Sequence, residues 1–107
     1  MLSISFRRVR PDQVDRLRAW MREVNAHADE VRETFVQETV EHEMAFLLDG
    51  KSGPIIVYVM EARDMEHARR IVQERPFPID VEHREIMSTV VDGPAAVETL
   101  MDIALAR

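Results

Sequence analysis

Cysteine is absent from this chain of 107 residues, which excludes disulfide bonds, thiol catalysis and thiolate metal sites, and fits a reducing compartment. Glycine occurs only 3 times, and a composition of 46% hydrophobic and 32% charged residues argues against disorder. Long apolar runs are also missing. The longest, IIVYVM at 55–60, is far shorter than the roughly 20 residues of a membrane span. Because the first residues lack the apolar core of a signal peptide, we expect a cytoplasmic protein without membrane contact.

Positive charge is in deficit as well. The formal net charge is −6, and the arginines are scattered among acidic residues instead of forming one run. Nucleic-acid-binding proteins present a basic patch to the phosphates, so we expect no nucleic acid partner. A chain of this length forms one domain, here residues 1–107, which buries roughly two-thirds of the surface that the unfolded chain exposes.

The spacing of the apolar residues predicts a strand followed by a long helix. Residues 2–9, LSISFRRV, alternate between apolar and polar side chains, which is typical of a strand with one apolar face. From residue 14 the apolar residues recur every three or four positions, which indicates one helix that a kink near Asn25 could interrupt. A coiled coil has the same spacing, but the stripe covers only about three heptads, so a helix that faces the domain core is favoured. The residues of the stripe are Val14, Leu17, Met21, Val24, Ala28, Val31 and Phe35.

The remaining elements complete an α+β pattern. Two strand-like runs, 43–49 and 54–61, are joined by the turn residues GKSG and predict a hairpin. Asp64 is a natural N-cap for a helix that ends near Glu74, and Asp80 is expected to cap a short helix that contains His83. VETLMDIAL at 97–105 alternates like a closing strand. This order predicts a ferredoxin-like βαββαβ domain, in which an antiparallel sheet carries both long helices on one face.

The hairpin strand at 55–60 predicts the oligomeric state. Its sequence, IIVYVM, sends apolar side chains to both faces of the sheet. Soluble monomers rarely leave such a large apolar patch in water. A second sheet is the simplest cover, so we expect a homodimer that is joined sheet to sheet.

Two stretches of the chain resemble a known group of proteins. EMAFLLDGKSGPIIVYVMEARD followed by PFPIDVEHREIM resembles an uncharacterised family of small bacterial proteins, a domain-of-unknown-function family within the dimeric α+β barrel superfamily. The resemblance covers residues 43–90, and elsewhere it covers the architecture alone. It implies a homodimer joined through the sheets, with a ligand cleft in each subunit between sheet and helices.

The superfamily that this resemblance implies includes cofactor-independent monooxygenases, haem-degrading monooxygenases, rhamnose mutarotases and muconolactone isomerases, so it assigns no single reaction. Haem-degrading members pair a first-strand asparagine with a tryptophan and with a histidine near the second helical region. This chain has Ser3 and Ser5 on its first strand and its only tryptophan, Trp20, on the first helix, so we expect no haem and no other cofactor. Mutarotase-like members use a histidine as acid or base on a sugar, and His83 lies in the corresponding helical region.

Two further motifs favour ordinary structure over chemistry. Residues 45–52, AFLLDGKS, fit a relaxed phosphate-loop pattern, but FLL is typical of a strand and Gly53 with Pro54 forbids the helix that such a loop needs. Adjacent glutamate and histidine residues at 41–43, 66–67 and 82–83 are suitable metal ligands, but neighbouring side chains point apart and no H-E-x-x-H spacing occurs. We therefore expect neither a nucleotide site nor a metal site.

His83 is the best candidate for a catalytic residue. If Asp80 caps the helix, His83 lies in its first turn, where burial and the helix dipole both lower the pKa of an imidazole. A neutral buried imidazole has one donor and one acceptor, for proton transfer or for a polar ligand. The alternative, equally open from residue types alone, is a structural histidine bonded to a backbone carbonyl. At about 100° per residue, His83 falls inside the apolar face that is formed by Ile79, Ile86, Met87 and Val90.

Three residues are the candidate substrate-binding companions of His83. They are Tyr58 on the central strand, Trp20 on the first helix and Glu43 at the start of the hairpin. Tyrosine and tryptophan suit a core as well as a cleft, and for Trp20 the core is favoured. Glu43 is either an exposed acid or a buried carboxylate that exchanges a proton with His83.

The sequence supports two hypotheses of function. In the first, a cofactor-independent homodimer binds a small organic molecule in each cleft and performs acid–base chemistry on it with His83, as in monooxygenases, isomerases or mutarotases. In the second, the domain's own side chains fill the cleft, and the chain serves dimerisation or partner binding. The cavity under His83 separates them, because ligand sites have volumes of at least about 300 Å³.

Overall fold

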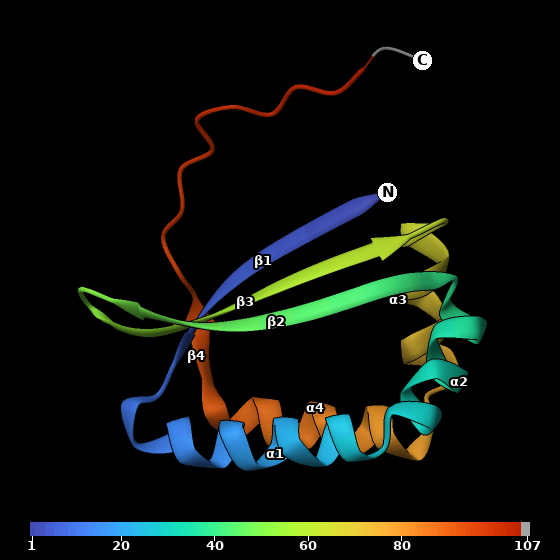
Figure 1. Cartoon of the computed structure of the whole chain (residues 1–107), viewed down its shortest axis with the longest axis horizontal. Helices are drawn as coiled ribbons and strands as arrows, with labels where there is room; N and C mark the ends of the chain where they lie inside the picture. The colour runs from blue at the N-terminus through green and yellow to red at the C-terminus, as the bar shows by residue number, and fades with distance from the viewer. Residues whose placement is uncertain (106–107) are drawn as a thin grey trace.

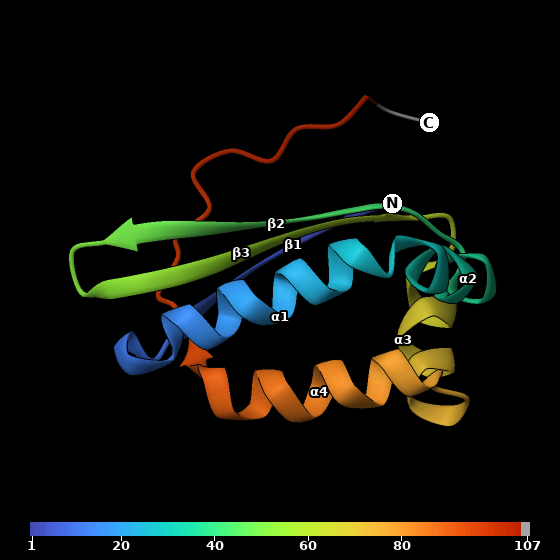
Figure 2. The same ribbon diagram turned by 60° about the horizontal axis from the view of Figure 1, so that its bottom comes forward.

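Helices and a four-stranded antiparallel sheet form the two layers of this protein, whose computed structural model describes residues 1–105. The strand order is β2-β3-β1-β4, and each neighbouring pair is antiparallel. The helices lie on one side of the sheet (Figures 1 and 2). The predicted α+β class and the antiparallel sheet are therefore confirmed. In chain order the elements are β1 (Leu2–Val9), a short 3-10 helix (Pro11–Gln13), α1 (Val14–Ala26), α2 (Ala28–Glu38), β2 (Val40–Gly50), β3 (Gly53–Ala62), α3 (Met65–Glu74), α4 (Pro78–Val90) and β4 (Val91–Pro94).

The long helix expected from residue 14 is in fact two helices. α1 and α2 are separated at His27, whose φ of −109° and ψ of 36° are not helical. The Nδ1 atom of His27 lies 2.9 Å from the carbonyl oxygen of Glu23, a local contact that competes with regular helix formation. The chain therefore breaks at His27, slightly beyond the expected kink near Asn25, and α2 turns toward α3 (Figure 1).

The hairpin and the helix after it agree with the sequence pattern. β2 and β3 pair in one register from His42 and Glu61 to the turn at 51–52, so the phosphate-loop-like stretch lies on a strand and its turn. Asp64 caps α3, and its carboxylate accepts a hydrogen bond from the backbone N–H of His67 at 3.0 Å. Both predictions rest on local turn and capping chemistry, and both are confirmed.

Two expectations for the last elements are wrong. The N-cap of α4 is Phe77, and Asp80 lies at the third helical position, where its Oδ2 accepts from the N–H of Phe77 at 2.9 Å. The closing strand is β4 and not 97–105, because the chain enters the sheet directly from α4 and Val91 pairs with Val9 of β1. Residues 95–105 lie outside helices and strands and pass the sheet on the side away from the helices (Figure 2).

The helix-covered face of the sheet contributes to two core clusters. The first joins β1 and β3 to α1 and α4, and it consists of Val9, Leu17, Trp20, Ile56, Met87 and Val90. The second joins β2 and β3 to α3, with Phe35 of α2 and Met60 packed against it, and it consists of Val40, Ala62, Met65 and Ala68. The pair α1 and α4 and the pair α2 and α3 pack against different parts of the sheet. The buried apolar residues therefore form two separate clusters.

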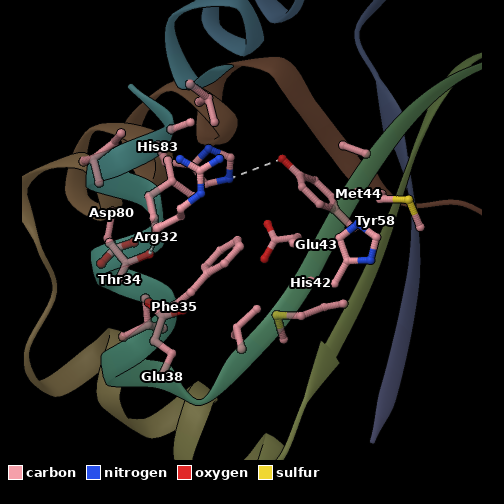
Figure 3. Close-up of a pocket in the computed structure, with 18 of the residues that line it drawn as sticks. Arg32, Thr34, Phe35, Glu38, His42, Glu43, Met44, Tyr58, Asp80 and His83 are labelled. Carbon is pink, nitrogen blue, oxygen red and sulfur yellow. Dashed lines mark hydrogen bonds between the residues drawn. The ribbon is translucent and has the colours of Figure 1, made fainter. Parts of the chain in front are cut away.

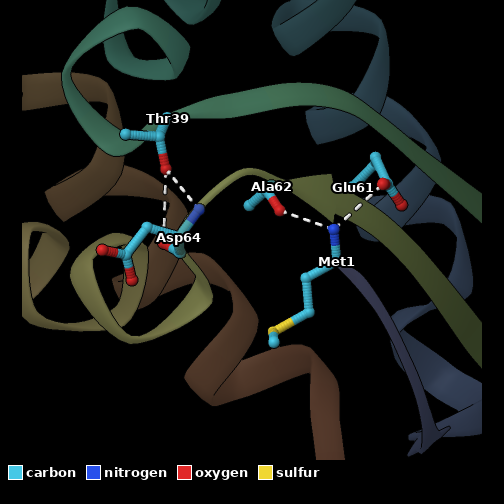
Figure 4. A network of polar contacts seen from close by, with 5 residues as sticks. All are labelled: Met1, Thr39, Glu61, Ala62 and Asp64. Carbon is cyan, nitrogen blue, oxygen red and sulfur yellow. Dashed lines mark hydrogen bonds and ion pairs between the residues drawn. The ribbon is translucent and has the colours of Figure 1, made fainter. Parts of the chain in front are cut away.

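Thr39 holds the junction between α2 and β2. Its φ of 64° is left-handed, a conformation that costs a non-glycine residue about 1–2 kcal/mol. Its hydroxyl compensates for this strain, because it donates to the carbonyl of Asp64 and accepts from the N–H of Asp64, both at 3.2 Å (Figure 4). Nearby, the amino group of Met1 donates to Oε1 of Glu61 at 3.0 Å. These contacts fix the end of α2, where Glu38 is the last residue.

Candidate functional site

A cleft of about 1000 Å³ lies between the sheet and the helices, between the two core clusters. Its lining includes side chains from both faces of β2, Met44 as well as Glu43, so the cleft extends to this edge strand. Small-molecule sites have volumes of about 300–1,000 Å³, so this cleft has ample room for one. Its apolar lining includes Met21, Val24, Val31, Phe35, Met60 and Ile79.

His83 lies on the α4 side of the cleft and is bonded through both ring nitrogens. The indole Nε1–H of Trp20 donates to Nδ1 of His83 at 2.8 Å. Nε2 of His83 lies 3.3 Å from the hydroxyl oxygen of Tyr58 (Figure 3). An indole N–H can only donate, so Nδ1 is the acceptor and the proton of the neutral ring is on Nε2. Nε2–H therefore donates to Tyr58, which leaves the tyrosine hydroxyl proton available for another acceptor.

Burial lowers the pKa of His83, although the negative charge of Asp80 opposes this effect. The hydrogen bond from Trp20 also lowers the pKa of His83. If the ring were protonated, Nδ1–H would face the indole N–H, and neither group could accept a hydrogen bond from the other. The predicted direction is confirmed, but one of its two predicted causes is wrong. Since α4 begins at Pro78, His83 lies in the second turn, beyond the first turn in which the helix dipole acts.

Glu43 and Tyr58 face His83 from the sheet. The carboxylate of Glu43, partly buried, points into the cleft beside the Tyr58 hydroxyl (Figure 3). Burial and then the charge of Asp80 raise the pKa of Glu43. Burial and then the charge of Glu43 raise the pKa of Tyr58, against a smaller opposing effect of Arg7, so the hydroxyl keeps its proton at neutral pH. Glu43 is thus neither the fully exposed acid nor the fully buried carboxylate that the sequence left open, and its exchange of a proton with His83 stays a prediction.

Trp20 belongs to the core, as its sequence context favoured. It is 5% exposed, and its only polar atom is bonded to His83. It lines the cleft together with His83, Glu43 and Tyr58, so the structure brings all four predicted site residues to one cavity. Trp20 contributes an apolar wall to that cavity, and its hydrogen bond fixes the orientation of His83.

Glu38 and Asp80, which the sequence analysis did not propose as site residues, also line the cleft. Glu38 is 8% exposed, and its Oε1 has no hydrogen-bond partner among residues 1–105. Burial and then the charges of Asp80 and Glu43 raise the pKa of Glu38 to about 7. A signal was present in the sequence: the three-and-four spacing that runs to Phe35 continues at Glu38, so a charged residue occupies the next position of a buried stripe.

The part of the chain that the structure describes contains no group of three or more histidine, aspartate or glutamate side chains that could hold a metal ion. The three carboxylates are thus not arranged as metal ligands. Over the same residues, every helix is too short or too polar to cross a membrane.

The fold and the cleft define a small α+β domain with a cavity between sheet and helices that is apolar on its walls and acidic at one end. The chain belongs to the family described as "Family of unknown function (DUF6176)", whose model matches residues 3–107. Neither the curated proteins nor the solved structures contain a match to it. Membership of an uncharacterised family, which the sequence suggested, is therefore confirmed.

Proposed function

We propose that this protein is a homodimer that binds a small organic molecule in the cleft of each subunit and performs acid–base chemistry on it. The observation that carries the proposal is the cleft of about 1000 Å³, toward which the polar groups of His83, Tyr58 and Glu43 converge. A cleft filled by the domain's own side chains would not leave a cavity of this size. Apolar walls with a few polar groups suit a small molecule that has an apolar body.

His83 and Glu43 take different roles in this proposal. Because Nδ1 of His83 accepts from Trp20, His83 acts through its Nε2–H as a donor that orients Tyr58. Tyr58 then presents its hydroxyl proton to the ligand. Glu43 transfers the proton, since its raised pKa brings it closer to neutral pH, where a general acid or base is most effective. The proposed catalytic unit is therefore His83 with Tyr58 and Glu43, and Trp20 holds the tautomer of His83.

The homodimer is proposed from the face of the sheet that no helix covers, which we name the open face. Phe46 is 52% exposed there and Leu48 is 51% exposed. An apolar surface of this extent marks an interaction site, and a second copy of the same surface is apolar throughout and therefore complementary to it. From the strand register, its apolar residues are Leu2, Ile4, Phe6, Met44, Phe46, Leu48, Ile55, Val57 and Val59.

Two other regions support an assembly. β2 is a long edge strand with an unpaired side, which soluble proteins usually cover or protect. Residues 95–105 run past the open face with exposed apolar side chains, among them Leu100 at 87% and Ile103 at 82%. The open face of a second copy would offer these side chains an apolar surface.

The finer classification also remains a proposal. The order β2-β3-β1-β4 with antiparallel neighbours supports a ferredoxin-like arrangement, and the open face supports its pairing as a dimeric α+β barrel. With the superfamily we propose the bacterial origin that the resemblance implies. The lack of cysteine supports a cytoplasmic location.

Native mass spectrometry of protein purified from its own cells tests both the dimer and the ligand in one measurement. We expect a dimer that carries one small molecule per subunit. Ala45→Phe places a bulky side chain in the cleft and should abolish ligand retention, whereas Ala19→Phe, at an exposed position of α1 outside the cleft, is the matched control. A monomer would contradict the dimer. A ligand-free dimer whose two variants behave alike in a ligand screen would favour the alternative, a non-catalytic dimerisation or partner-binding module.

The role of His83 is tested separately with His83→Gln. An amide keeps one donor and one acceptor but does not titrate near neutral pH. We expect this variant to fold and dimerise but to retain less ligand, because a flexible amide does not hold its acceptor on Trp20 and its donor on Tyr58 as the planar ring of His83 does. If instead the melting temperature falls while ligand retention by the folded fraction is unchanged, His83 is a structural residue of the core.

A further inference from the structure

Two acidic residues of the cleft, Glu38 and Asp80, have no role in the acid–base unit just described. Asp80 has a local role, since its Oδ2 accepts from the N–H of Phe77 at the start of α4. Glu38 has no such partner, because its Oε1 is buried and no donor among the described residues reaches it. An ionised carboxylate without a partner is strongly unfavourable in a buried position, so this oxygen calls for a donor from outside the chain.

The surroundings of Glu38 are negative. Asp80 from α4 and Glu43 from β2 both act on its carboxyl, and α2 ends at Glu38, so the partial negative charge of the helix C-terminus adds to them. Arg32, on the same helix and in the cleft lining, is turned to Asp29, with which it forms an exposed ion pair at 2.8 Å. Arg69 of α3 also lines the cleft, but the charges that act on Glu38 are those of Asp80 and Glu43. The charge around Glu38 thus favours a cation.

We propose that the ligand of the cleft carries a protonated nitrogen, as in an ammonium, amidinium or guanidinium group, which binds to Glu38 while its apolar body lies against Phe35 and Met60. The negative charges of Asp80 and Glu43 add to the attraction. The inference rests on the proposed function, because it names the chemical class of the ligand for that same cleft. A protonated nitrogen supplies both the positive charge and the N–H donors that the buried carboxylates need. A metal ion fits less well, since the described residues offer no group of three ligands with suitable geometry.

Cation binding is coupled to the protonation of Glu38. A bound cation favours the ionised carboxylate, so it displaces the proton that Glu38 holds near pH 7. The charged groups that face Glu38 are Asp80 and Glu43, and the cation compensates their repulsion as well. Affinity should therefore increase from about pH 6 to about pH 8, where an alkylammonium ion with a pKa near that of lysine, about 10.4, still keeps its proton.

Isothermal titration calorimetry with three probes of similar size tests the inference on the full chain. The probes are 2-phenylethylammonium, the neutral 2-phenylethanol and the anionic 3-phenylpropanoate, each measured in buffers of different ionisation enthalpy. We expect the ammonium probe to bind at least about tenfold more tightly than the alcohol, with release of protons near pH 7. Glu38→Gln should abolish both the preference and the proton release, whereas Glu33→Gln, at an exposed position of the same helix, should keep both. Glu43→Gln should weaken the preference and serves as a second variant if Glu38→Gln does not fold.

Three results would overturn the inference, and they differ in whether the proposed small-molecule function also fails. If the alcohol or the carboxylate binds as tightly as the ammonium probe, and equally in Glu38→Gln, the cleft is a small-molecule site without selectivity for cations. If Zn²⁺ or Ca²⁺ alone binds in a manner that depends on Glu38 while the ammonium probe does not, the acidic end is a metal site. If no probe binds and no small molecule co-purifies, the cleft is not a ligand site and the proposed function fails as well.

Discussion

The two faces of strand β3 are similar in residue type and opposite in environment. Ile56 and Tyr58 pack beneath α1 and α4, and Ile56 is 2% exposed. Ile55 and Val57 point to the open face, where Val57 pairs with Phe46, which is 52% exposed. An apolar side chain thus does not show by itself whether the fold of its own chain covers it, because the same residue types are buried on one face and exposed on the other.

The two faces also differ in where their polar residues lie. On the helix-covered face, Glu43 of the edge strand β2 and Tyr58 of β3 line the cleft. On the open face, the polar residues Arg8, His42 and Glu61 lie at the strand ends, and the interior is apolar. A face with polar groups inside a cavity is typical of a ligand site, whereas a continuous apolar face is typical of an interface between subunits.

The largest effect should come from replacing a neighbouring isoleucine on each face. Ile56→Ala removes a buried side chain from the core and should lower the free energy of unfolding by about 2–5 kcal/mol at any protein concentration. Ile55→Ala, with the same change on the open face, should cost about 1 kcal/mol in dilute protein and more where the dimer is populated. Urea denaturation at two protein concentrations measures both. Equal losses at both concentrations would mean that the open face contributes nothing to association.

The pH dependence of stability probes the acidic end of the helix-covered face. The pKa of Glu38 is raised from 4.5 to about 7 in the folded protein, so between these values the folded state binds more protons than the unfolded state. The free energy of unfolding should therefore fall as pH rises through this window, by up to about 3 kcal/mol. Glu38→Gln should reduce this slope strongly and leave the part that the raised pKa of Glu43 contributes, and Glu33→Gln should keep the whole slope. An unchanged slope in Glu38→Gln would assign it to other groups.

A smaller effect is expected where α2 joins β2. Thr39→Ala removes the two hydroxyl contacts with Asp64 and keeps the left-handed backbone, so it should lower the free energy of unfolding by about 1–2 kcal/mol. Thr39→Gly loses the same contacts but adopts this conformation without strain, so it should be less destabilised. Thermal unfolding of the pair measures the difference. A glycine variant less stable than the alanine variant would contradict the role of backbone strain.

The smallest change in stability is expected for Trp20→Phe, which keeps an aromatic ring and removes the donor to His83. The loss should be about 1 kcal/mol, but the pKa of His83 should rise, because the indole N–H no longer favours the neutral ring. NMR titration should show a pKa for His83 below 6.5 in the wild type and a higher value in the variant. If the pKa does not change, Trp20 does not determine the tautomer of His83.

Elements that depend on short-range interactions could be predicted from the sequence. The alternation at 2–9, the turn residues of the hairpin and the cap at Asp64 each act within a few residues, and the structure has β1, the hairpin and α3 at the predicted places. His83 was also accessible to prediction, because a polar residue on an apolar helical face must be buried with partners wherever that helix packs. Its neighbours Trp20 and Tyr58 could be named as candidates but not as its hydrogen-bond partners.

The remaining features depend on contacts between residues far apart in the chain. The apolar stripe through Ala28 continues without interruption, yet the helix breaks at His27, because α2 packs on α3 instead of continuing along the sheet. The alternation at 97–105 has the period of a strand, but β4 occupies the edge of β1 and leaves this segment without a partner strand. Glu38 acquires its raised pKa only where the sheet and α4 bring Glu43 and Asp80 beside it. Periodicity determines which side of an element is apolar, whereas burial, protonation and the shape of the cleft depend on which elements meet, and that is a property of the whole folded chain.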